Sequence, residues 1–206
     1  MKVILINGSP REKGCTYTAL SEIESTLIKN GIETEIFQLG NKPIQGCIGC
    51  GSCKKNGQCF NTDKVAEFLE KAESANGFIF GSPVHYAAAS GSLTSFMDRA
   101  FYSGGSKLEG KPAAAIVSCR RGGASSTFDQ LNKYFTINCM PIVASQYWNQ
   151  VHGNTPEEVK QDEEGFQTMR TLANNMAWLL KCIEAGKEKG ITFPERETVI
   201  RTNFIR

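Results

Sequence analysis

The sequence predicts an α/β fold in which helices cover both faces of a parallel sheet. Short apolar runs alternate with amphipathic segments along the chain, and continuous apolar runs are typical of parallel strands buried on both faces. The chain has 206 residues, of which 40% are hydrophobic and 21% charged, enough for one well-buried domain. No repeat, low-complexity linker or long charge run separates a second domain. We therefore expect one five-stranded domain over residues 1–190 and a C-terminal tail over 191–206.

The first half of the chain contains three expected strands and two expected helices. Residues 3–6 form a continuous apolar run that Asn7-Gly8 ends, which is typical of a fully buried strand. Apolar residues then recur at helical spacing over 16–29, and Asn30-Gly31 supplies a stop signal. The other elements of this half are an alternating strand over 32–37, a helix over 64–73 capped by Asp63, and a buried strand over 77–81.

The second half of the chain continues this alternation. We expect a helix over 90–101, a strand over 113–118, a helix over 125–135 and a strand over 141–145. Thr155 can cap a long final helix with Pro156 at its first position, ending near Lys189. Ligands of such sheets bind beyond the carboxyl ends of the strands, where the strand order reverses, so the loops after the strands are the candidate site.

The composition excludes several functional classes. With 23 Lys and Arg residues and 21 Asp and Glu residues, the net charge of +2 is too small for a nucleic-acid footprint or a membrane-binding surface. No apolar stretch approaches the roughly 18 to 20 residues of a membrane span, and the apolar run after Met1-Lys2 is too short for a secretory signal. We expect a soluble, cytoplasmic protein without nucleic-acid or membrane partners.

The loop after the first strand has the composition of an anion-binding site. It runs Gly8-Ser9-Pro10-Arg11-Glu12-Lys13-Gly14-Cys15-Thr16 and opens directly into a helix. The hydroxyls of Ser9 and Thr16, the Arg11 guanidinium and the backbone amides of the first helical turn can all bind one phosphate, which the helix dipole also favours. The Walker and dinucleotide-binding glycine patterns are missing, so a phosphate monoester is favoured. An ordinary strand-to-helix turn is the alternative.

Two later segments extend the pattern. The first is Gly81-Ser82-Pro83-Val84-His85-Tyr86, followed by Gly91 and Phe96-Met97-Asp98-Arg99, and the second is Arg120-Arg121-Gly122-Gly123. Together with the first loop, in this order and spacing, they resemble the flavodoxin-like NADPH-dependent FMN reductase family and its iron-sulfur flavoprotein branch. The resemblance covers roughly residues 1–150. It implies a flavodoxin-like three-layer sandwich whose five-stranded parallel sheet has the order 2-1-3-4-5.

The resemblance also implies FMN and a set of residues that bind it. They are Ser9, Arg11, Cys15, Thr16, Pro83, Val84, His85, Tyr86, Ser118, Arg120, Arg121, Gly122 and Gly123. Many relatives have Asn where this chain has Cys15, and a thiol is a poorer hydrogen-bonding group than an amide. The backbone N–H of Cys15 can still bind the phosphate. No catalytic residue is assigned.

The second and third loops have the chemistry that a flavin ring requires. Pro83 can preset a turn that leaves backbone amides facing the ring, and His85 and Tyr86 add polar and aromatic surface. Arg120 or Arg121 can stabilise negative charge on the reduced ring or attract the phosphate of NADPH. An exposed, solubilising arginine pair is the alternative.

Four of the eight cysteines lie within a cysteine-rich loop over residues 43–60. Cys47, Cys50, Cys53 and Cys59 have the spacing C-x2-C-x2-C-x5-C, with glycines between them that permit tight wrapping. The short intervals match compact ferredoxin-type iron-sulfur binding better than two separated zinc knuckles. The resemblance likewise implies a cluster here, and [4Fe-4S] is the specific expectation. Structural zinc, free thiols and a disulfide are the alternatives.

We therefore expect an FMN-dependent oxidoreductase that passes electrons from a reduced nicotinamide, NADH or NADPH, to a quinone, a flavin or another acceptor. The alternative is a non-catalytic carrier in which FMN and the cluster exchange electrons with a ferredoxin-type partner. A third possibility keeps the fold without flavin and uses the cysteines for structural zinc. A homodimer or homotetramer is expected, and Tyr147 and Trp148 can lie near the pocket, at a dimer contact or, for Trp148, in the core.

Overall fold

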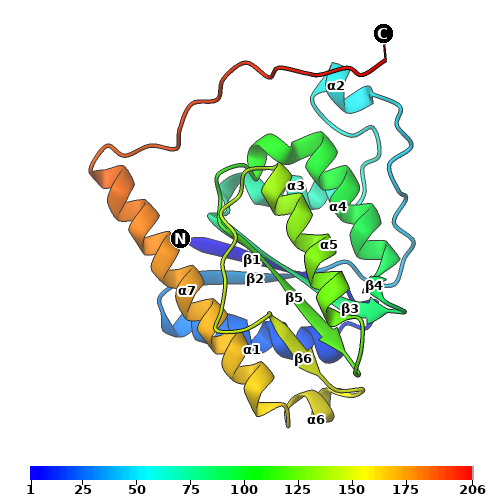
Figure 1. Cartoon of the computed structure of the whole chain (residues 1–206), viewed down its shortest axis with the longest axis vertical. Helices are drawn as coiled ribbons and strands as arrows, with labels where there is room; N and C mark the ends of the chain where they lie inside the picture. Colours follow the sequence, from blue (N-terminus) through cyan, green and yellow to red (C-terminus); the bar gives the residue numbers. More distant parts are fainter. Residues whose placement is uncertain (206) are drawn as a thin grey trace.

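Five parallel strands form the sheet of the computed structural model, which describes residues 1–205 (Figure 1). The strands are β1 (Lys2–Asn7), β2 (Glu33–Gln38), β3 (Gly77–His85), β5 (Ala113–Cys119) and β6 (Gln150–His152). Their order is β2-β1-β3-β5-β6, and every neighbouring pair is parallel. This confirms the predicted architecture and order. A sixth strand that was not predicted, β4 (Ala88–Ala89), pairs antiparallel with the end of β3.

Helices cover both faces of this sheet, as expected. They are α1 (Cys15–Lys29), α2 (Ser52–Asn56), α3 (Lys64–Ser74), α4 (Gly91–Gly104), α5 (Ala124–Ile137), α6 (Pro156–Val159) and α7 (Glu163–Glu188), with a 3-10 turn over Gly105–Lys107. Alternate residues of β1 serve opposite faces, because side chains alternate along a strand. Val3 and Leu5 pack with α1 and α7, whereas Ile4 and Ile6 pack with α3, α4 and α5 in a phenylalanine-rich core.

The predicted strand over 141–145 is wrong, because the edge strand lies further along the chain. Only Ile142 forms a bridge there, to Ala113 at the start of β5, and regular pairing resumes at β6. The residues between them are not assigned to a strand. The side chain of Asn149 compensates, since its Nδ2 donates a hydrogen bond to the Ala115 carbonyl of β5 (3.1 Å).

The predicted long final helix is two helices. Thr155 caps α6 and Pro156 stands at its start as expected, but α6 ends at Val159 and α7 begins at Glu163. Asp162 separates the two because its carboxylate accepts a hydrogen bond from the Gly165 backbone N–H (2.9 Å), the geometry of a new N-cap.

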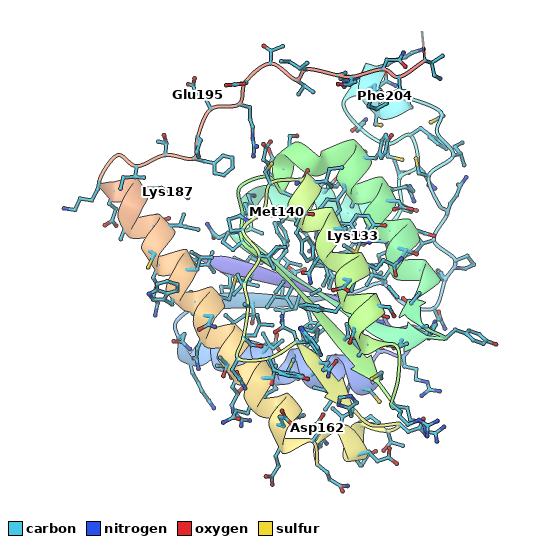
Figure 2. All side chains as sticks on the ribbon, in the orientation of Figure 1. Lys133, Met140, Asp162, Lys187, Glu195 and Phe204 are labelled. Atoms are coloured by element: carbon cyan, nitrogen blue, oxygen red, sulfur yellow. The ribbon has the colours of Figure 1, made fainter. Side chains whose placement is uncertain are left out.

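Beyond α7, residues 189–205 form an extended tail without helix or strand (Figure 1). Arg196 in this tail pairs with Glu109 (2.5 Å), whereas Phe204 is 90% exposed (Figure 2). Arg206 lies outside the described residues. Within residues 1–205, no helix combines the length and apolar character needed to cross a membrane.

Candidate cofactor site

The candidate site lies at the carboxyl edge of the sheet, where the loops after β1, β3 and β5 meet. The register pairs Asn7, the last residue of β1, with Gly81 of β3, and it pairs Pro83 with Ser118 near the end of β5. The three predicted loops therefore start side by side, although they are separated by about 75 and 35 residues of sequence.

Buried polar groups hold the first loop in one conformation. The Asn7 side chain is fully buried, and its Oδ1 accepts a hydrogen bond from the Ser9 backbone N–H (3.1 Å). Ser9 Oγ in turn accepts from the Arg11 backbone N–H (3.1 Å), and Gln38 Nε2 donates to the Ser9 carbonyl (2.8 Å). Because these contacts exist within the protein itself, the loop is ordered before any ligand binds.

The start of α1 has the features of an anion site. Its N-cap is Gly14, which has no side chain to bind the free N–H groups of the first turn, and that turn carries no acidic residue. Burial raises the pKa of the Cys15 thiol, although the Cys15 backbone amide and the Arg11 guanidinium act in the opposite direction. Cys15 is therefore a neutral thiol, and its backbone rather than its sulfur is the group suited to bind an anion.

The loop after β1 approaches β3 and α4 too closely for a side chain at Gly8. A Cβ atom on Gly8 would lie 2.8 Å from the Gly81 carbonyl oxygen and 2.9 Å from Leu93 Cβ. The Gly8 N–H donates to that same carbonyl (2.8 Å), and Ser90 Oγ donates to the Gly8 carbonyl (2.8 Å). These contacts fix the first loop against the N-terminus of α4.

A pair of buried hydroxyls connects the first loop to β5. Thr16 Oγ1 and Ser118 Oγ lie 2.8 Å apart, and both residues are almost fully buried. Each hydroxyl has one proton, and only one of the two protons is needed for this bond. The remaining proton can be donated to a ligand beside α1.

The second loop differs from the expected turn at Pro83. Pro83 and Val84 belong to β3, which continues to His85 and folds back onto β4 as a hairpin. Tyr86 occupies the turn with a left-handed φ of 57°, which a non-glycine residue rarely adopts, and its ring is fully exposed. Backbone strain of this kind is frequent at ligand sites.

The third loop packs on this hairpin. Gly123 has a φ of 85°, and a Cβ atom there would lie 2.8 Å from Val84 Cγ1 and 3.0 Å from Ala87 Cα. Arg120, Arg121 and Gly122 are exposed. The structure thus brings together the buried members of the predicted set, Ser9, Thr16 and Ser118, together with the half-buried Cys15, Pro83, Val84 and Gly123. Arg11, His85, Tyr86, Arg120, Arg121 and Gly122 are exposed around them. Their cofactor contacts stay predictions.

Sequence reasoning missed residues that shape the site without a motif of their own. Gln38 comes from β2, and nothing local indicates that its amide reaches the first loop. Ser90 carried a recognisable signal, since Ser is a preferred N-cap residue, and its Oγ accepts from the Leu93 N–H. Trp148 is not in the core: it is 51% exposed, and its ring centroid lies 4.9 Å from that of Tyr147.

The cysteine-rich loop forms a second candidate centre on the α4 side of the sheet. Cys47, Cys50, Cys53 and Cys59 are free thiols, and all four line one pocket of about 110 Å³. Glycines at 49, 51 and 57 have left-handed φ values, which allow the chain to wrap this pocket. In the described part of the chain no three His, Cys, Asp or Glu side chains converge on one point. Four thiols that line one pocket fit a metal centre bound by thiolates, and their sulfur atoms would have to move closer together to bind it.

The sequence matches a known family over most of its length. A family model described as NADPH-dependent FMN reductase matches residues 1–155. An iron-sulfur flavoprotein of Methanocaldococcus jannaschii is 36% identical over 192 residues, which cover 89% of this chain and 100% of the relative. Curated relatives thus carry both terms, iron-sulfur and flavoprotein, in their names.

Solved structures share the fold at low sequence identity. A flavodoxin from the domain Archaea has a TM-score of 0.61 at 14% identity, over 88% of this chain and 99% of its own. FerB, a flavoenzyme NAD(P)H:(acceptor) oxidoreductase from Paracoccus denitrificans, has a TM-score of 0.66 at 14% identity, over 88% of this chain and 97% of its own. The predicted flavodoxin-like fold is confirmed.

Proposed function

This chain belongs to the NADPH-dependent FMN reductase family, and from that premise we propose that it is an FMN-dependent oxidoreductase that takes electrons from NADH or NADPH. The acceptor would be a quinone, a flavin or another small redox molecule. The observation that carries the proposal is the meeting of three loops at one edge of the sheet, with an open anion site at the start of α1.

The first loop fits the phosphate of FMN. Phosphate oxygens would accept hydrogen bonds from the uncapped N–H groups of α1 and from the Ser9 hydroxyl. They would also accept from the hydroxyl proton that Thr16 and Ser118 do not use between themselves. Arg11 would add a charge-assisted hydrogen bond, which is stronger than a neutral one. Because the loop is already ordered by Asn7 and Gln38, little entropy would be lost on binding.

The second and third loops fit a flavin ring. When bound, FMN supplies a hydride acceptor, its N5 atom, and this connects a two-electron donor to the final electron acceptor. Backbone N–H groups near Val84 would orient the ring, and the exposed side chains of His85 and Tyr86 would border it. Arg120 and Arg121 would place positive charge where negative charge develops on reduction.

For the cysteine-rich loop we propose a [4Fe-4S] cluster held by Cys47, Cys50, Cys53 and Cys59. Four free thiols that line one pocket support this assignment, as does the spacing of three short intervals. Such a cluster would let the two electrons of a hydride leave the flavin one at a time. Structural zinc is the competing occupant, because four thiolates also suit zinc.

The donor can be identified by anaerobic reduction of the purified flavoprotein. Rapid bleaching of the flavin absorbance near 450 nm by NADPH or NADH is expected. If neither nicotinamide reduces the flavin but a reduced ferredoxin does, the proposed enzyme activity is wrong and the alternative of an electron carrier gains support.

Arg11→Ala is expected to raise the dissociation constant for FMN about 10- to 100-fold, since it removes a charge-assisted phosphate contact of roughly 1.5 to 3 kcal/mol. Fluorescence quenching on titration of FMN into the flavin-free protein measures this. The matched control is Lys29→Ala, which removes a cation from the opposite end of α1. Equal affinity for Arg11→Ala and the control would refute the role of Arg11.

We also propose that the chain assembles as a homodimer or homotetramer. Tyr147 and Trp148 support this proposal, because they form an exposed aromatic pair and such residues are enriched at protein interfaces. Light scattering is expected to give a mass of at least twice 22.6 kDa. A monomeric mass at micromolar concentration would contradict the proposal.

A further inference from the structure

Arg99 belongs to the Phe96-Met97-Asp98-Arg99 run that carries part of the family resemblance, and its side chain contacts the cysteine-rich loop. The residue is on α4 and only 3% exposed. Its guanidinium forms a two-pronged pair with Asp63, with Nη1 2.6 Å from Oδ2 and Nη2 3.0 Å from Oδ1. Asp63 is itself held, because its Oδ1 accepts from the Val65 N–H (3.0 Å) and caps α3. Two core helices therefore fix the position of the guanidinium.

The same guanidinium reaches both ends of the cysteine-rich loop. Nη1 donates to the Gln45 carbonyl (3.3 Å), two residues before Cys47. Nη2 donates to the Asn61 carbonyl (3.2 Å) and to Cys59 Sγ (3.4 Å), at the other end of the loop. One side chain thus joins the two ends where the loop meets the core.

The number of contacts exceeds what a buried ion pair requires. Nη1 and Nη2 together have four N–H groups, and these face five acceptors: two carboxylate oxygens, two carbonyls and one sulfur. The pair with Asp63 alone would already balance the charge, and a buried ion pair by itself is weak support for stability. The extra donors all point to the cysteine-rich loop.

We propose that Arg99 is a positioning residue that anchors the cysteine-rich loop and, through its hydrogen bond to Cys59 Sγ, raises the reduction potential of the group held by the four thiols. The second half of this inference rests on the proposed [4Fe-4S] cluster. Because Asp63 balances the charge of Arg99, the effect comes from the N–H donor itself, since a hydrogen bond to a ligand sulfur favours the more negative, reduced state of a cluster. The effect is specific to Cys59, because none of the other three sulfurs accepts a hydrogen bond from Arg99 within residues 1–205.

Hydrogen exchange on the metal-free protein tests the anchoring half. In Arg99→Gln, amides of residues 45–61 are expected to exchange at least about tenfold faster than in the wild-type protein, while those of α1 are unchanged. Arg99→Lys keeps the charge beside Asp63 but loses the fork geometry, so it should fold while still exchanging faster over 45–61. Unchanged exchange over 45–61 in Arg99→Lys and Arg99→Gln would overturn the anchoring role.

The tuning half is tested by redox titration of the iron-loaded protein. Arg99→Gln is expected to have a lower cluster potential than the wild-type protein, and Arg99→Lys an intermediate one. The control is Lys54→Gln, which removes a cation that lines the same pocket but whose side chain donates no hydrogen bond to a described residue. Equal potentials in the wild-type protein and both Arg99 variants would overturn the tuning role.

These two experiments separate this inference from the cluster assignment. A wild-type chain that binds no iron under anaerobic reconstitution would overturn the cluster and the tuning role together. Hydrogen exchange in that same chain would still decide whether Arg99 anchors the loop.

Discussion

Gly8→Ala is expected to lose FMN during purification and to unfold at a lower temperature than the wild-type protein. The added methyl group would lie 2.8 Å from the Gly81 carbonyl oxygen of β3 and 2.9 Å from Leu93 Cβ of α4, so the loop after β1 must move away from both elements. Overpacking of this kind costs about 1 to 3 kcal/mol of stability. The N–H groups of α1 and the backbone near Val84 would then no longer face one ligand, so we expect FMN affinity to fall more than about tenfold.

Gly91→Ala is the matched control for this variant. Gly91 lies at the start of α4, beside the same loops, and a Cβ atom there meets no described atom within 4 Å. It should therefore retain FMN and the wild-type melting temperature. If Gly8→Ala behaves like Gly91→Ala in both measurements, the close approach of the first loop to β3 and α4 is not what holds the site together.

Cys50→Ser is expected to reduce the iron content of the anaerobically reconstituted protein to background. A [4Fe-4S] cluster uses one thiolate for each iron, and a serine hydroxyl is a much poorer ligand than a thiolate. FMN should remain bound, because Cys50 lines the cysteine-rich pocket and belongs to none of the three loops of the candidate cofactor site. Cys182→Ser, which changes an exposed cysteine of α7, should keep the wild-type iron content. Full iron retention in Cys50→Ser would contradict the proposed ligand set.

The central strands and the first loop were predictable because their sequence signals are local. Residues 3–6, 77–81 and 113–118 are buried on both faces, so they read as continuous apolar runs, and β1, β3 and β5 contain them. The edge of the sheet was not predictable in the same way. Residues 141–145 have strand-like composition, but pairing shifts to β6, where a buried Asn149 supplies a contact that no hydrophobic pattern reveals.

Turns without glycine were also missed. The hairpin at Tyr86 places a non-glycine residue at positive φ, so the usual glycine signal for a turn was missing and Pro83 was taken as the turn instead. The break between α6 and α7 carried a signal, Asp162, that was outweighed by the helical pattern on both sides.

The residue types of the candidate site were predictable from the sequence, whereas the directions of their side chains were less so. Thr16 and Ser118 meet because parallel strands bring their carboxyl ends to one edge. Arg99 carried no site prediction, because the direction of its side chain depends on the face of α4 that carries it. That face is decided by tertiary packing, which places Arg99 against Asp63 and the cysteine-rich loop.

The most direct test of the proposed function is to purify the protein without oxygen and to quantify FMN, iron, acid-labile sulfide and zinc per chain, together with the visible spectrum before and after reduction. About one FMN, with about four irons and four sulfides, is expected in each chain. FMN without iron would support the flavin reductase and rule out the cluster assignment. A colourless, zinc-containing protein that takes up no added FMN would contradict the proposed FMN-dependent oxidoreductase.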